Sequence, residues 1–154
     1  MATPIVEQIV QHVADSVTAI GGLTAVRPTR LGFTGNAMPE NGKVLVVMGE
    51  TERDEELSRE GHPPALAWRQ TIELLAFVVE SDAATTAIDT TINQVRSDIE
   101  KKLREDPARG GLAIDTLIGA PEILPAVEGV EFTGVIVTAV VIYRTSEDDP
   151  YTSA

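Results

Sequence analysis

The stretch KKLREDPARGGLAID, residues 101–115, combines the end of a helix with a change of direction in the chain. Three of its first four side chains are basic, which suits the last turn of a helix because the backbone dipole is negative there. Pro107 cannot continue a helix, and Gly110 and Gly111 readily adopt the positive φ of a reversal. We therefore predict that this stretch turns the chain back onto a sheet.

Two segments carry the apolar spacing of amphipathic helices: residues 4–20, and residues 83–104, which end within this stretch. Gly21 and Gly22 end the first, and Ser81 or Asp82 caps the second. The predicted apolar stripes are Ile5, Ile9, Val13, Val17 and Ile20 in the first helix, and Ala84, Ile88, Ile92, Val95, Ile99 and Leu103 in the second. Both helices therefore have one face to bury.

Apolar and β-branched runs predict strands near residues 23–27, 43–49, 65–80, 112–118 and 130–145. The third and the last are longer than the usual 3 to ~10 residues of a strand, and both are largely apolar on two faces. We expect either a hairpin shared with a neighbouring subunit or β-bulges. The predicted fold is α+β, with a mixed, mainly antiparallel sheet of four to five strands and both helices on one face.

The chain has 154 residues, which fits a single domain covering residues 1–154. Between Glu50 and Glu60 lie six acids and two arginines, so residues 50–64 are predicted to form an exposed acidic loop. Residues 146–154 are predicted to be a flexible C-terminal tail.

The composition narrows the functional classes. Hydrophobic residues make up 43% of the chain, no apolar run reaches the ~18 residues of a membrane helix, and no secretory signal is expected. The chain has no cysteine, which excludes disulfides and thiolate zinc sites and suits a reducing compartment. A net charge of −12 without clusters of lysine and arginine disfavours direct binding of nucleic acid.

The motifs for catalysis and cofactors are sparse. His12 and His62 are the only histidines, and neither has metal-ligand spacing. The chain contains no nucleotide-binding loop and no nucleophile elbow. We predict no cofactor and no metal. A small carboxylate-dependent enzyme remains an alternative, with Asp115, Glu122 and His62 as its candidate residues.

The order of the elements resembles the tail terminator proteins of long-tailed bacteriophages, also called minor tail or tail-completion proteins. The resemblance spans nearly the whole chain. In the passage from helix to glycine turn it is carried by Leu103, Asp106, Gly110, Gly111 and Leu112. In the closing strand it is carried by Tyr143, Arg144, Thr145, Asp149 and Pro150.

This resemblance implies a structural virion protein and not an enzyme. It implies a homo-hexameric ring at the head-proximal end of the tail, assembled in the host cytoplasm, that stops growth of the tail tube and docks the filled head. Its partners are then the tail tube protein and a neck or head-completion protein, without a membrane. A neck or head-completion connector is a second possibility, and an α+β adaptor without a ring is a third.

Two sets of side chains are the candidate functional residues. If DNA passes through a ring without specific binding, acidic walls repel it over about one Debye length, ~8 Å. The candidates for lining or rimming that channel are Glu50, Glu52, Asp54, Glu55 and Glu56. The alternative is that these acids only keep the subunit soluble. The candidates for subunit or partner contacts are Trp68, Phe132, Tyr143 and Tyr151.

Overall fold

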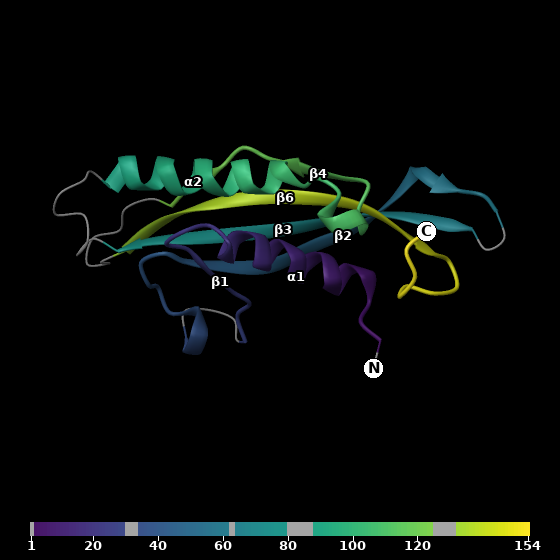
Figure 1. Ribbon diagram of the computed structural model, residues 1–154, viewed down its shortest axis with the longest axis horizontal. Helices are drawn as coiled ribbons and strands as arrows, with labels where there is room; N and C mark the ends of the chain where they lie inside the picture. Colours follow the sequence, from purple (N-terminus) through teal and green to yellow (C-terminus); the bar gives the residue numbers. More distant parts are fainter. Residues whose placement is uncertain (1, 30–33, 62–63, 80–87, 125–131) are drawn as a thin grey trace.

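A computed structural model describes residues 2–29, 34–61, 64–79, 88–124 and 132–154 (Figure 1). The predicted cap at Ser81 or Asp82 and the predicted helical residue Ala84 lie outside these ranges. The helices are α1 (Ile5–Thr18) and α2 (Ile88–Glu105), with 3-10 turns η1 (Gly35–Ala37) and η3 (Arg109–Gly111). The strands are β1 (Thr24–Val26), β2 (Lys43–Arg59), β3 (Ala65–Val79), β4 (Asp115–Ile118), β5 (Glu122–Ile123) and β6 (Phe132–Ser146).

The strands form one sheet in the order β1-β2-β3-β6-β4, and β5 also pairs with β6. Only β1 and β2 run parallel, and the other pairs are antiparallel. The predicted α+β class and mainly antiparallel sheet are confirmed. The strand count is higher than predicted because two residues of the Pro-punctuated connection, Glu122 and Ile123, pair with the edge of β6.

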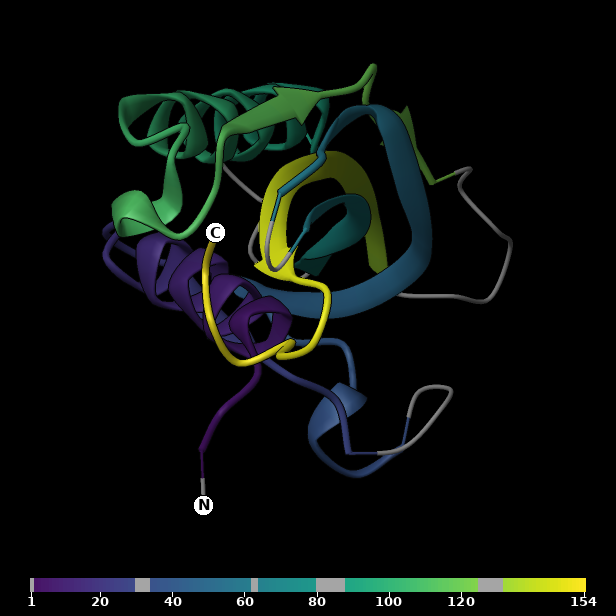
Figure 2. The same ribbon diagram turned by 90° about the vertical axis from the view of Figure 1, so that its right-hand side faces the viewer.

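Both helices lie on one side of the sheet, as predicted (Figure 2). They bury their apolar stripes against alternate residues of β2, β3 and β6, whose side chains share that face. From α1 these are Ile5, Ile9, Val10, Val13, Ala14 and Val17, and from α2 they are Ile92, Ile99 and Leu103. The opposite face, which we call the open face, carries a small cluster of Ala37, Leu45 and Phe77.

The reversal after α2 follows the prediction from residues 101–115. Gly110 and Gly111 have φ of 69° and 88°, and the chain then enters β4 antiparallel to β6. Arg109, which the sequence did not single out, is fully buried there. Its guanidinium donates hydrogen bonds to the carbonyls of Leu103 and Asp106, which are among the last carbonyls of α2 and the turn after it.

Residues 50–59 are not a loop, which corrects the prediction for residues 50–64. Strand β2 continues to Arg59, and its last paired residue lies opposite Ala65 of β3. The polar sequence still forms a strand because β3 pairs with β6 along its whole length and so offers its other edge to β2. Charged side chains are common on such edge strands because they discourage pairing with other chains. The expected exposure holds for most of these acids.

The C-terminal segment, residues 147–154, is not a free tail, which corrects the prediction of a flexible tail at residues 146–154. The amide of Ser146 donates to the carbonyl of Thr152 (3.1 Å), and Ser153 forms a bridge with Thr145. The carbonyl of Pro150 accepts a hydrogen bond from the amide of Ile5 at the start of α1 (3.2 Å). The segment folds back because its backbone groups find partners on the edge of β6 and at a helix N-terminus.

Candidate assembly surfaces

The outer part of the β2–β3 hairpin extends past the ends of both helices (Figure 1). We call this part, residues 50–61 and 64–70, the arm. It carries all five acids that the sequence proposed for a channel wall. Its shape depends on two register shifts between β2 and β3, one between Met48 and Thr51 and one between Asp54 and Arg59. The extra residues of both bulges are in β2. Between β3 and β6, the two long strands for which bulges were one expected explanation, the described residues pair without a register shift.

Gln70 holds the first shift at the base of the arm. Its side chain is fully buried, and its amide nitrogen donates to the carbonyls of Gly49 (3.1 Å) and Glu50 (3.3 Å). The hydroxyl of Thr51 donates to its carbonyl oxygen. A bulge disrupts the backbone ladder, and here a buried amide bonds to the carbonyls at that position. The arm therefore leaves the body at a fixed point of the sheet.

Asp54 holds the second shift. Its carboxylate accepts hydrogen bonds from the Nε of Arg69 (2.7 Å) and from the amide of Leu57 (3.1 Å), and the residue is 8% exposed. The hydrogen bond from Arg69 lowers the pKa of Asp54 below its usual value of 3.8. Arg144 of β6 adds a hydrogen bond from its Nε to the carbonyl of Leu57 (2.9 Å). Asp54 is thus committed to holding the arm together, unlike the other four acids.

The remaining four of the five candidate channel acids, Glu50, Glu52, Glu55 and Glu56, are exposed. Glu55 forms an ion pair with Arg53 (3.2 Å). The other three make no ion pair with the residues that the structure describes. Together with Glu60, which is also exposed and has no ion-pair partner among the described residues, these three carboxylates give the arm an acidic surface.

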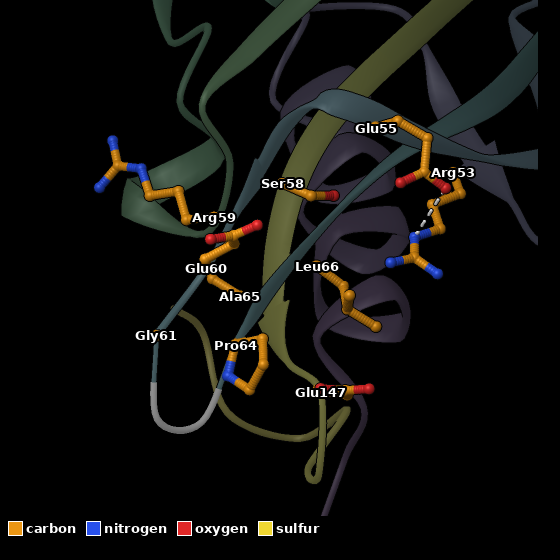
Figure 3. A pocket seen from close by; sticks show the side chains of 10 residues that line it. All are labelled: Arg53, Glu55, Ser58, Arg59, Glu60, Gly61, Pro64, Ala65, Leu66 and Glu147. Carbon is orange, nitrogen blue, oxygen red and sulfur yellow. Dashed lines mark ion pairs between the residues drawn. The ribbon is translucent and has the colours of Figure 1, made fainter.

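A hollow of about 670 Å³ lies near the tip of the arm (Figure 3). Its lining mixes both signs of charge, including Arg53, Arg59, Glu55, Glu60 and, from the C-terminal segment, Glu147. Pockets for small molecules are mostly apolar with a few placed polar groups, and this hollow lacks that character. Among the described residues, no three side chains of histidine, aspartate or glutamate come together to hold a metal ion.

Of the four aromatic residues proposed for partner contacts, Tyr143 is buried, Trp68 and Phe132 are half-buried and Tyr151 is exposed. Tyr143 is 5% exposed in the main core, and burial raises its pKa. Trp68 donates from Nε1 to the hydroxyl of Thr145 (3.1 Å), and the ring of Phe132 stands edge-on to Phe77 at 5.6 Å. Trp68 and Phe132 keep part of their surface accessible beside these internal contacts, so their partner contacts stay a prediction. Tyr151, 44% exposed, is accessible to a partner.

The residues of the enzymatic alternative do not meet. Asp115 pairs with Ile142 and Glu122 with Ile136, so both lie along the same strand six residues apart. At ~3.3 Å per residue this separates them by roughly 20 Å, too far for a cooperating acid and base. His62 lies outside the described residues. The other histidine, His12, has its Nε2 3.4 Å from the carboxylate of Asp106.

The two residues that shape the arm, Arg69 and Gln70, were missed in the sequence. The signal that could have identified Gln70 is the alternation of apolar and polar side chains along β3. Trp68, Gln70 and Ile72 share one face, so Gln70 is a polar residue in an apolar series. Such a residue, once buried, needs hydrogen-bond partners, and a bulge in the neighbouring strand provides them.

Replacing Asp54 by alanine is expected to loosen the arm and leave the body folded. It removes the acceptor for Arg69 and Leu57, whereas Glu56→Ala removes an equal charge without a side-chain partner in the structure. We expect trypsin to cleave Asp54→Ala after Arg53 or Arg59 at least several-fold faster than Glu56→Ala. Because folding lowers the pKa of Asp54, its contribution is present above about pH 3.8 and is lost as the pH falls below that value. Equal cleavage of both variants would contradict this role.

No protein-family model and no curated protein matches this chain. In the part of the chain that the structure describes, neither helix has the length and apolar character to cross a membrane.

Proposed function

We propose that this protein forms a ring that caps the head-proximal end of a phage tail tube, ends tube growth and docks the head. The sequence motifs noted above support this proposal. So does the combination of a helix-covered sheet with an arm that extends beyond the helices. A projecting arm on a small subunit is suited to reach a neighbour or an axial channel.

The observation that carries the proposal is the charge on that arm. Residues 50–60 hold six acids and two arginines, and Glu50, Glu52 and Glu56 are exposed without an ion-pair partner among the described residues. A polyanion that must slide through a ring is best served by walls that repel phosphate, because each lysine or arginine contact adds affinity. We propose that these carboxylates line or rim the channel and that DNA passes without specific binding.

The proposed partners are the tail tube protein on one side of the ring and a neck or head-completion protein on the other. Tyr151 is a candidate for one of these contacts because its ring is accessible on the C-terminal segment. The proposed location is the virion, at the head-proximal end of the tail, after assembly in the host cytoplasm. A neck connector at the same junction is the second candidate, since it also surrounds the path of the DNA.

The test is to locate labelled protein on virus particles and on isolated tails. We expect one site per tail, at the head-proximal end, and retention of the label on tails that never met a head. Label on heads and not on free tails would favour the neck connector. Label along the tube or at the distal tip would overturn both assignments.

A further inference from the structure

Four strands, namely β1, β4, β5 and the part of β2 beyond β1, have an outer edge without a strand partner among the described residues. Strand β2 pairs with β1 at Lys43–Leu45, so its outer edge is open from Val46 to Arg59. At the opposite margin, β4 pairs with β6 on one side and has its other side open. The C-terminal segment covers the neighbouring edge of β6 at residues 144–146. Unpaired edges of this kind add strands from other chains.

Exposed apolar side chains lie at both margins. Met48 on β2 is 39% exposed, Leu117 on β4 is 43% exposed, and Ile114 just before β4 is 41% exposed. Large exposed apolar residues beside an open edge favour association. A contact between the two margins would cover all three at once.

The two margins also have the right relative direction. Strand β2 is antiparallel to β3, β3 to β6 and β6 to β4, so β4 runs antiparallel to β2 within one subunit. Rotation about an axis parallel to the strands preserves their direction. A neighbour placed by such a rotation therefore presents its β4 antiparallel to β2, which is slightly the more stable pairing.

The strand registers place the two margins at the same level. Ile118 of β4 lies opposite Ala139, which lies opposite Ile72, which lies opposite Met48. By the same path Thr116 is level with Thr51. Strand β4 is thus level with the part of β2 that begins just past the end of β1. A neighbour needs little shift along the strands to bring β4 beside this free segment.

Symmetric pairing of two β2 edges is disfavoured. An antiparallel pair of identical arms would bring Glu50, Glu52 and Glu56 of one copy close to the same residues of the other. Like charges on facing strands destabilise a sheet. A head-to-tail contact between different margins avoids this repulsion, and such a contact closes into a ring when the rotation permits.

We propose that β4 of one copy adds to β2 of the next copy beyond Leu45, so that the sheets of successive subunits join head to tail. This inference rests on the proposed ring and assigns the surfaces that build it. The helices then lie on the outside, where the circumference is larger. The open face, with Glu52 and Glu73, lies toward the axis.

Cysteine cross-linking tests this contact directly, because the chain has no cysteine. The double variant Met48→Cys with Ile118→Cys places one thiol at each margin on the helix-covered face. A second double variant, Val47→Cys with Leu117→Cys, does the same on the open face. Under mild oxidation of the full chain we expect a ladder of covalent dimers, trimers and larger species up to the closed ring from at least one of them.

The control is Met38→Cys with Ile118→Cys, since Met38 is 52% exposed but lies after η1 and on neither margin. It should give no ladder. Cross-linked dimers from Met48→Cys alone would show a symmetric β2 contact and overturn the proposal. If the protein self-associates but neither test variant gives a ladder, the assignment of these two margins is wrong, while the proposed ring is not contradicted. A chain that stays monomeric at its highest soluble concentration would overturn the edge pairing, while the labelling of tails still decides the proposed function.

Discussion

Replacing Ile99 by aspartate is expected to leave the chain unfolded at room temperature. Ile99 is fully buried in the main core, where α2 packs against the sheet. Truncating such a side chain alone costs about 2 to 5 kcal/mol, and an unpaired buried carboxylate adds a desolvation cost. Domains of this kind are stable by only about 5 to 15 kcal/mol, so the combined loss removes most or all of the folded state.

The matched control is Gln94→Asp, which adds the same charge on the exposed face of the same helix. Circular dichroism and thermal melting should show a folded control with a nearly unchanged midpoint, and no cooperative transition for Ile99→Asp. Ile92→Asp should act in the same direction because that side chain is also buried. Normal melting of both buried variants would mean that the assigned helix face is wrong.

The helices and the reversal after α2 were predictable because their signals are local. An apolar spacing of three and four residues is visible in one segment, and Pro107 and Gly110 act at their own positions. The stripe through Ile92 and Ile99 therefore identified the buried face before any partner was known. The buried Arg109 was not predictable in the same way, because its role depends on carbonyls that only the folded turn brings together.

The arm was missed because its structure comes from a partner strand. Residues 50–59 lack the alternation of apolar and polar side chains that identifies a strand in a sequence, so no strand was predicted there. The backbone of β3 supplies the ladder, Gln70 bonds to carbonyls in the first bulge, and Arg69 pairs with Asp54 at the second. The side-chain contacts of Gln70 with Gly49 and of Arg69 with Asp54 span 21 and 15 residues of sequence. The same limit explains the C-terminal segment, whose partners include Ile5 at the other end of the chain.

The structure also changes how the channel hypothesis is best tested. Reversing Asp54 would break its contacts with Arg69 and Leu57, and reversing Glu55 would break its pair with Arg53. Glu52 lies opposite Arg69, so a lysine there would face a like charge. Glu50 and Glu56 remain as exposed carboxylates whose replacement leaves these contacts in place. They change the charge of the arm with the least effect on its shape.

The double variant Glu50→Lys with Glu56→Lys is expected to assemble normal tails that eject DNA about ten-fold or more slowly at low salt, because its lysines contact phosphates inside the ring. It brings residues 50–60 from a charge of −4 to neutral. The control Asp89→Lys with Asp98→Lys makes the same change in charge on the exposed face of α2, away from the arm, and should eject normally. Raising the salt from about 50 to 200 mM should restore much of the rate, since contacts with phosphate weaken steeply over that range. Normal ejection at low salt from fully assembled particles would exclude the arm from the channel and leave solubility as the role of its charge.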